Sequence, residues 1–334
     1  MNNYSIGLLL IVKDEERFIN DCLESAKNFF DEIVIIDTGS KDNTISIAKN
    51  FTDKIYSFNW NDSFSEARNF GKSKVSSNWL FYLDADEQIE NFDKQFFISQ
   101  IQNNNISAFF VTIKNIITHN LIQYDKQIRL FLNINEIYWK NRIHEQITDS
   151  IFEYNKKYNK IIADSNFSIL HFGYRPYIIK KRNKYQRNLE ILKKELSDND
   201  FNNLYLLLKY ISSLRKVDAE KNKNEILNSI KIFFNHLKNL NNYDLLTLKP
   251  VKDFPYEISN NINLLSNDFL NEIINFYIEQ KIVSIELYYL QYIFALKNNH
   301  NEAAENYFKL IKYNYNKNDL TINPDLKLKL EKLL

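Results

Sequence analysis

Short apolar runs alternate with amphipathic segments through the first hundred residues. Between the runs, apolar side chains recur at the three- and four-residue spacing of helices. Ser63 and Glu66 have the spacing of a capping box, so we expect a helix to begin there. Strands that alternate with helices predict an α/β fold with a doubly wound, mostly parallel sheet. The predicted strands are Ile6–Val12, Glu32–Asp37, Lys54–Trp60 and Trp79–Leu83.

The pattern changes twice further along. From about Ser107 the apolar runs have less helix between them, which predicts antiparallel or mixed strands that complete the sheet. These runs are Ala108–Ile113, Gln127–Leu132 and Ile161–Phe172. After Tyr174 the spacing is helical, so we divide the chain into an α/β domain, residues 1–175, and an all-α domain, residues 176–334.

Within the all-α domain, two segments form a predicted antiparallel helix pair, residues 284–297 and 301–313. Such a pair resembles tetratricopeptide-like helical hairpins, and a plain helical bundle is an equal alternative. Residues 241–261 contain Pro250 and Pro255, and we predict an irregular connection there.

Composition indicates an ordinary globular protein. Apolar residues make up 44% of 334, and the net charge of +1 gives no reason to expect nucleic-acid binding. The single cysteine, Cys22, excludes an internal disulfide, and a reduced, cytoplasmic setting is the default. The run Ile6–Val12 is too short to span a bilayer, and no cleavage-site pattern follows it, so we expect neither a transmembrane segment nor a signal peptide.

Two carboxylates follow the fourth predicted strand. Asp84 and Asp86 flank Ala85, and side chains two positions apart lie on the same face of a strand. The carboxyl end of a parallel strand borders the crevice where open α/β sheets bind ligands. Carboxylate oxygens there suit Mg²⁺ or Mn²⁺ bound to a diphosphate. The alternative is that either aspartate caps the next helix.

Acidic residues also end the first two predicted strands. Asp37 precedes Thr38 and Gly39 and is placed to accept hydrogen bonds from a nucleotide, or else to stabilise its own turn. Gly39 indicates a backbone with positive φ. Asp14 and Glu15 follow the first strand and face either the nucleotide or the start of a helix.

Four further residues are candidates for the site. Arg68 suits phosphate or carboxylate, although most arginines lie on the surface. Glu145 is a candidate general base, and His144 a candidate base or substrate ligand, against the alternative of a polar loop. His171 ends the last strand and either completes a metal site or is structural. The sequence lacks G-x-G-x-x-G and G-x-x-x-x-G-K-[ST], so a metal and side chains would bind phosphate in place of a glycine-rich loop.

In their order these segments resemble family 2 glycosyltransferases of the GT-A fold, over about the first 175 residues. The subgroup that the chain resembles most carries helical repeats after the catalytic domain. It includes SunS-like peptide S-glycosyltransferases and transferases acting on lipopolysaccharide cores, polysaccharides and flagellin. The matching segments are residues 12–16, 32–44, 60–69, 83–87 and 143–146.

The resemblance implies roles for some of these candidates. Asp86, with Asp84, would hold Mn²⁺ or Mg²⁺, and His171 is added as a metal ligand from its position at the end of the last strand. Glu145, with His144 beside it, is chosen as catalytic from its chemistry and is not carried over from the family. The E-D base signature usual in the family is not evident here. The residues that would bind the nucleotide sugar are Val12, Asp14, Glu15, Asp37, Arg68, Asp84 and Ala85.

We therefore expect a metal-dependent inverting glycosyltransferase. The donor would be a UDP-hexose, a UDP-N-acetylhexosamine or another nucleotide sugar, and the acceptor a peptide, protein or glycan. The helical domain would bind the acceptor or form a homo-oligomer. Two alternatives stay open: a sugar nucleotidyltransferase, although the glycine-rich signature of that class is missing, and a non-catalytic helical-repeat adaptor.

Overall fold

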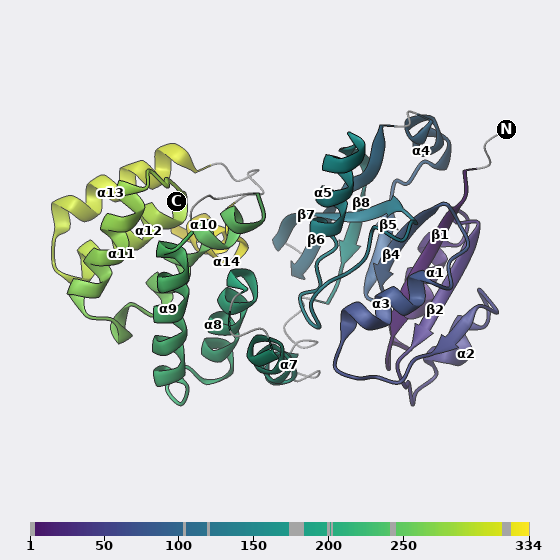
Figure 1. The fold of residues 1–334 in the computed structure, drawn as a ribbon, viewed down its shortest axis with the longest axis horizontal. Coiled ribbons are helices and arrows are strands. Elements are labelled where there is room, and N and C mark those ends of the chain that lie inside the picture. The colour runs from purple at the N-terminus through teal and green to yellow at the C-terminus, as the bar shows by residue number, and fades with distance from the viewer. Residues whose placement is uncertain are drawn as a thin grey trace. The chain divides into compact units, whose positions relative to one another are not determined.

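The computed structural model describes residues 4–102, 105–118, 121–173, 184–198, 201, 203–240, 245–315 and 322–333 (Figure 1). The chain forms two compact units, residues 1–182 and 183–334. Among the described helices none combines the length and the apolar character needed to cross a membrane.

The first unit is built on one mixed sheet. Its eight described strands lie in the order β3-β2-β1-β4-β7-β6-β8-β5. The neighbours β3, β2, β1 and β4 are parallel, as are β6 and β8, and the other pairs are antiparallel. The expected doubly wound α/β sheet is confirmed. The strands are β1 (Ile6–Val12), β2 (Glu32–Asp37), β3 (Ile55–Ser57), β4 (Trp79–Asp84), β5 (Glu87–Glu90), β6 (Ile106–Thr118), β7 (Leu121–Leu132) and β8 (Ile161–His171).

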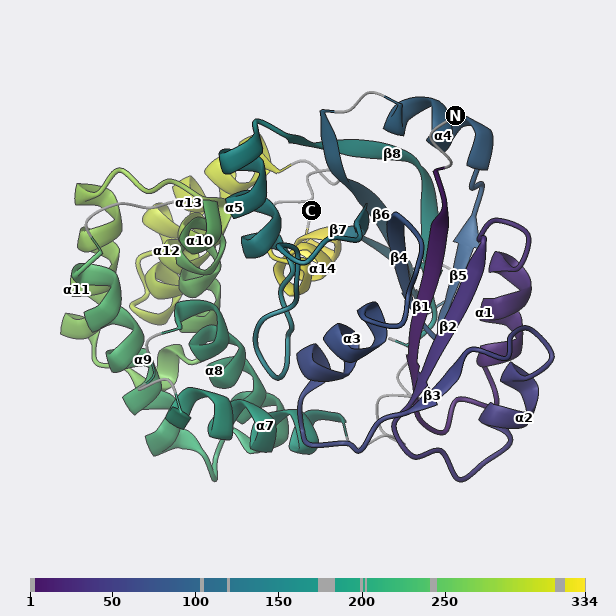
Figure 2. The same cartoon turned by 45° about the vertical axis from the view of Figure 1, so that its right-hand side comes forward.

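Helices cover both faces of this sheet, as Figure 2 shows for α1 and α2 on one side and α3 on the other. In β1, Leu8 and Leu10 pack with the α1 side, whereas Leu9 packs with the opposite side. Strands buried on both faces read as continuous apolar runs, which explains why β1, β2 and β4 are so clear in the sequence. The helices are α1 (Ile19–Ala26), α2 (Thr44–Ala48), α3 (Phe64–Lys72), α4 (Lys94–Ile101) and α5 (Thr148–Tyr158).

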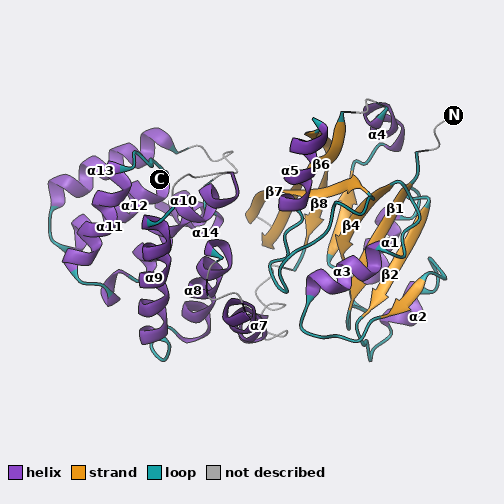
Figure 3. Cartoon of the chain, viewed as in Figure 1, coloured by secondary structure: helices purple, strands orange, loops and turns teal. Residues whose placement is uncertain are grey.

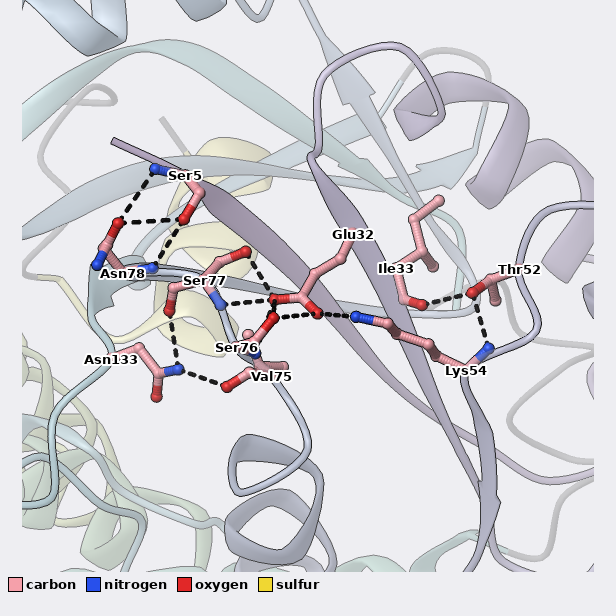
Figure 4. A network of polar contacts seen from close by, with 10 residues as sticks. All are labelled: Ser5, Glu32, Ile33, Thr52, Lys54, Val75, Ser76, Ser77, Asn78 and Asn133. Atoms are coloured by element: carbon pink, nitrogen blue, oxygen red, sulfur yellow. Dashed lines mark hydrogen bonds and ion pairs between the residues drawn. The ribbon is translucent and has the colours of Figure 1, made fainter. Parts of the chain in front are cut away.

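A polar network joins the strands at their amino ends (Figure 4). The Glu32 carboxylate, at the start of β2, accepts hydrogen bonds from the backbone N–H and hydroxyl groups of Ser76 and Ser77, at 2.6–3.1 Å. Lys54 donates to its other oxygen at 2.6 Å. Burial alone would raise the pKa of Glu32, but these donors lower it to about 2. The network thus fixes the amino ends of β2 and β4.

The second unit is helical throughout its described residues (Figure 3). Consecutive helices pack on one another, as α7 on α8, α8 on α9, and α12 on α13. The helices are α7 (Lys184–Asp198), α8 (Leu204–Asp218), α9 (Lys223–Lys238), α10 (Leu245–Asn260), the 3₁₀ helix η1 (Ile262–Leu264), α11 (Asn267–Glu279), α12 (Ile285–Lys297), α13 (Asn301–Asn314) and α14 (Pro324–Leu333).

One sequence prediction here is wrong. Residues 245–260, expected as part of an irregular connection, form α10 with Pro250 and Pro255 inside it. Pro255 has no N–H to donate to the carbonyl of Val251, four residues earlier. The Tyr277 hydroxyl donates to that carbonyl instead, at 2.5 Å. A buried side chain from α11 thereby compensates the helix for its proline. Residues 241–244 lie outside the described part of the chain.

Candidate active site

The parallel strands place the predicted site residues at one edge of the sheet. In the register of β1, Val12 lies beside Asp37 of β2, and Ile11 lies beside Asp84 of β4. Asp37 and Asp84 therefore end two strands that flank the same neighbour. Val12 is buried. This is the edge where open α/β sheets bind ligands.

The loops after β1 and β2 are tied to each other. Asp14, in the left-handed region at φ 54°, accepts a hydrogen bond from the Lys41 N–H at 2.7 Å. Its own N–H donates to the Ser40 hydroxyl. Asp37 accepts from the Ser40 N–H at 2.9 Å, so it stabilises its turn as the alternative reading predicted. Gly39 has φ +104°, which confirms the positive φ expected there.

The neighbouring residues are also held by this loop pair. The Glu15 N–H donates to the Thr44 hydroxyl at 2.7 Å, beside the start of α2. Asp42 accepts from the Thr44 N–H at 2.9 Å, and Asn43 holds the N-cap position of α2. The backbone of Glu15 is thus held beside the start of α2, and the role of its carboxylate stays a prediction.

Arg68 connects two of the candidate carboxylates. Ser63 caps α3 as predicted, by accepting from the Glu66 N–H, and α3 then presents Arg68 one turn in. The Arg68 guanidinium bonds Asp84 through Nη2 and Glu145 through Nε, each at 2.8 Å. Only 5% of Arg68 is exposed, so it is not a surface arginine. The structure therefore joins Arg68, Asp84 and Glu145, which are far apart in sequence.

The loop that carries His144 and Glu145 is anchored to α3. Lys140 and Gln146 close the loop by exchanging backbone hydrogen bonds of 2.9 and 3.0 Å. The Asn69 side chain bonds both the N–H and the carbonyl of Trp139, at 3.0 and 2.9 Å. His144 is in the left-handed region, at φ 51°. Glu145 is thus held next to Asp84 by the base of the loop and by Arg68.

The turn after β4 is fixed along its backbone. The Asp84 N–H donates to Glu87 at 2.9 Å, and the Cys22 thiol lies 3.6 Å from the Asp84 carbonyl. The Phe172 N–H donates to the Asp86 carbonyl at 3.0 Å. Ala85, between the two aspartates, is buried. The backbone of this turn is therefore held at both ends.

Two arginines balance the negative charge of the carboxylates at this turn. The guanidinium of Arg129, on β7, bonds the fully buried Glu87 at 2.6 Å. Burial by itself would raise the pKa of Asp84, but the charges of Arg68 and Arg129 hold it well below its usual range. Asp84 is therefore ionised, and 42% of its side chain is exposed.

Asp86 and His171 lie together at the end of β8. Asp86 Oδ1 is 3.6 Å from His171 Nε2, and His171 Nδ1 is 2.7 Å from Asn115 Oδ1. Because an amide oxygen only accepts, Nδ1 carries a proton and Nε2 is directed to Asp86. A Cβ atom at Gly173 would lie 2.3 Å from Asp86 Oδ2. The backbone therefore passes close to the carboxylate, and a larger residue at this position would have to displace Asp86 and His171.

This pair fits a divalent cation. A carboxylate oxygen and an imidazole nitrogen are both ligands of Mn²⁺, and the bond that Nδ1 makes to Asn115 Oδ1 leaves Nε2 as the nitrogen available for a metal. Among the described residues no three His, Cys, Asp or Glu side chains converge as a complete ligand set. Oxygens of a phosphate and water would therefore complete the coordination shell. The carboxylate of Asp84, the third predicted ligand, pairs with Arg68.

Several residues of this site were not predicted from the sequence. Asn115 and Arg129 come from β6 and β7, where polar residues within strand patterns gave no distinctive signal. Asn69 and Glu87 entered the sequence analysis only as the last residues of two matching segments, 60–69 and 83–87. Gly173 could have been singled out, since the chain contains only four glycines.

Comparison with known proteins identifies the first unit. The family model described as glycosyl transferase family 2 matches residues 8–189, which is more than half of the chain. A TPR repeat-containing protein of Synechococcus elongatus is 30% identical over 196 residues, covering 58% of this chain and 48% of that protein. The SPbeta prophage-derived glycosyltransferase SunS of Bacillus subtilis is 26% identical over 241 residues, covering 70% and 54%. The chain spans about half the length of these relatives.

Solved structures with similar folds include Staphylococcus aureus TarS, with a TM-score of 0.42, 11% identity, and coverage of 91% of this chain and 54% of that one. Glucosyl-3-phosphoglycerate synthase of Mycobacterium tuberculosis, solved with Mg²⁺ and UDP, gives a TM-score of 0.42 and 15% identity over 58% and 79%. The family match and the fold agree with the resemblance first seen in the strand-end motifs. The chain belongs to glycosyl transferase family 2.

Proposed function

We propose that this protein is a metal-dependent, inverting glycosyltransferase. Its donor is a nucleotide sugar, of which a UDP-hexose or UDP-N-acetylhexosamine is the choice that the family favours. Its acceptor is a peptide, protein or glycan. Family membership supports sugar transfer in general, and the arrangement of the site supports the finer assignment.

The observation that carries the proposal is the pair of Asp86 and His171 at the carboxyl edge of the sheet. Their facing atoms are 3.6 Å apart, and Gly173 leaves room beside them. The loop of Asp14 follows β1, which is next to β4, and the loop of Asp37 follows β2, one strand further along the same edge. A diphosphate bound at Asp86 and His171 would therefore have its nucleoside directed along the edge towards Asp37.

The chemistry follows from charge. Cleavage of a sugar–phosphate bond leaves negative charge on the departing diphosphate, and a bound divalent ion would supply positive charge there. Asp86 and His171 would hold that ion, and Asp84 would orient the sugar or the ion from its exposed side. A base is also needed to take the proton from the acceptor.

We propose Glu145 as that base. Arg68 holds its Oε1 at 2.8 Å, and 17% of the side chain is exposed, so Oε2 is the atom that would take the proton. Because Arg68 also bonds Asp84, the base and the donor site share one buried cation. Direct displacement with one base inverts the anomeric carbon.

The helical unit is proposed to bind the acceptor or to form a homo-oligomer. Helical hairpins of the tetratricopeptide type stack into extended binding surfaces. The relative from Synechococcus elongatus is named for such repeats, and its match covers 58% of this chain. The division of labour between residues 1–175 and 176–334 is part of the proposal.

The experiment is a donor panel. The protein is incubated with nucleotide sugars and Mn²⁺, and donor hydrolysis and self- or peptide glycosylation are followed by intact mass. One UDP-sugar should be consumed, and the mass of the acceptor should rise by one sugar residue. Consumption of a nucleoside triphosphate with a sugar phosphate would instead indicate a nucleotidyltransferase, and no turnover of any donor would favour the adaptor alternative.

A further inference from the structure

We propose that the buried ion pair between Glu87 and Arg129 positions the Asp84–Asp86 turn for metal and diphosphate binding. Both would be positioning residues, since neither is exposed enough to touch a substrate. The inference rests on the proposed metal site, and extends it to two residues without an assigned role.

Glu87 uses both of its carboxylate oxygens within the protein. Oε1 accepts from Arg129 Nη2 at 2.6 Å, and Oε2 accepts from the Asp84 N–H at 2.9 Å. One side chain thus ties the first residue of the turn to β7, which lies beside β4 in the sheet. With Cys22 at the Asp84 carbonyl and Phe172 at the Asp86 carbonyl, the turn has little freedom to move.

Arg129 is in turn held from two directions. It is 4% exposed, and its guanidinium carbon lies 4.6 Å from the centre of the Tyr82 ring. Tyr82 itself is fixed by a hydrogen bond from its hydroxyl to the Ile128 carbonyl, at 2.9 Å. The position of Glu87 is therefore set by the sheet and not by the solvent-facing loop.

Stability alone does not explain this pair. Burying two charges costs solvation energy, and replacing such a pair by apolar residues is often neutral or stabilising. Within the described part of the chain, Arg129 Nε and Nη1 are also buried without a hydrogen-bond partner, which is a further cost. Stabilising the fold would not require the hydrogen bond from the Asp84 N–H to Glu87. Through that bond the ion pair is connected to the candidate active site.

A second ion pair in the same region provides a matched control. Glu90, at the end of β5, pairs with Lys114 of β6, and about a third of each side chain is exposed. It lies on the same strand as Glu87 but makes no bond to the Asp84–Asp86 turn. Removing it changes the charges of β5 and leaves the turn untouched.

The test compares two double variants, Glu87→Leu/Arg129→Met and the control Glu90→Leu/Lys114→Met. UDP affinity is measured by calorimetry in Mn²⁺ and again in EDTA, and the ratio of the two affinities is the metal-dependent gain. Thermal midpoints are recorded in the same buffers. We expect the first variant to keep a midpoint close to that of the parent while the gain falls at least tenfold. The control should keep the full gain.

Arg129→Lys is a milder second variant that keeps the charge but not the planar fork of donors. It should fold and show a smaller reduction of the gain, so the test does not depend on the double variant alone. A gain within twofold of the parent in either folded variant would overturn the positioning role. A parent protein without any metal-dependent gain would overturn the proposed metal site itself, which is a distinguishable result.

Discussion

The two ends of the central sheet use buried charge in opposite ways. At the amino ends, the carboxylate of Glu32 is surrounded by donors from Ser76, Ser77 and Lys54. At the carboxyl ends, Arg68 and Arg129 neutralise carboxylates, yet among the described residues the buried N–H groups at Arg68 Nη1 and at Arg129 Nε and Nη1 have no hydrogen-bond partner. The charge at the amino ends is fully hydrogen-bonded within the protein, whereas the arginines at the carboxyl ends are hydrogen-bonded only in part.

This difference assigns stability mainly to the amino ends of the strands and function mainly to their carboxyl ends. A carboxylate with several donors and a low pKa stabilises the fold. Carboxylates grouped beside cations, with a glycine pressed against one of them, create a local charge pattern that suits a metal and a diphosphate. Substitutions at the two ends should therefore change different measured quantities.

The largest expected effect is at Asp86. Asp86→Asn keeps the shape of the side chain but removes the charge that would hold the metal, so turnover should fall about a thousandfold. The thermal midpoint should change little. Steady-state kinetics with the donor identified in the panel provides the measurement. Turnover above a tenth of the parent value would show that catalysis does not depend on the Asp86 carboxylate as a metal ligand.

Glu32→Gln should lower the stability of the fold and leave turnover unchanged. The folded pKa of about 2 lies below the unfolded value near 4.5, so the carboxylate stabilises the fold above pH 4.5, and this is lost as the pH falls towards 2. The difference corresponds to about 3 kcal/mol at pH 7. Urea unfolding should show this loss, and the variant should lack that part of the acid dependence.

The control for Glu32 is Glu24→Gln, which removes an exposed pair with Lys27 and should change stability by less than about 0.5 kcal/mol. The turnover of folded Glu32→Gln should match that of the parent. If Glu32→Gln lost turnover while its stability stayed unchanged, the assignment of stability to the amino ends and function to the carboxyl ends would be wrong.

Glu145→Gln tests the proposed base. An amide cannot take the acceptor proton, so the rate of transfer should fall about a hundredfold, while the affinity for UDP changes by less than about threefold. Glu153→Gln, at an exposed acid that pairs with Lys140, is the matched control and should be silent. Weak UDP binding together with a normal transfer rate would assign Glu145 to the donor site instead.

The smallest expected effect comes from a pair of glycines at opposite ends of the sheet. Gly173→Ala would place a Cβ 2.3 Å from Asp86 Oδ2, and should weaken Mn²⁺-dependent UDP binding about tenfold. Gly7→Ala would press on Val75 at the amino end, at 2.5 Å, and should lower the thermal midpoint while UDP binding persists. If Gly173→Ala and Gly7→Ala weakened UDP binding equally, the claim that only the carboxyl ends of the strands bind the donor would be contradicted.

The sequence predicted strands and site residues best where the pattern of a single strand was sufficient. Strands β1 and β2 were predicted to the residue, because strands buried on both faces are continuous apolar runs, and Asp37 and Asp84 follow from where such runs end. Arg129 and Glu87 could not be paired in advance, since they are 42 residues apart and the register of an antiparallel strand is not encoded locally. Helix α10 was missed because the hydroxyl that compensates Pro255 comes from Tyr277, in another helix.

A metal-bound diphosphate is tested most directly by the affinity of the parent protein and of Asp86→Asn for UDP, each measured in Mn²⁺ and in EDTA. Mn²⁺ should strengthen UDP binding to the parent at least tenfold and have little effect on the variant. Equal affinities of the parent in Mn²⁺ and in EDTA, or an undiminished metal effect in Asp86→Asn, would contradict a metal-bound diphosphate at the carboxyl end of the sheet.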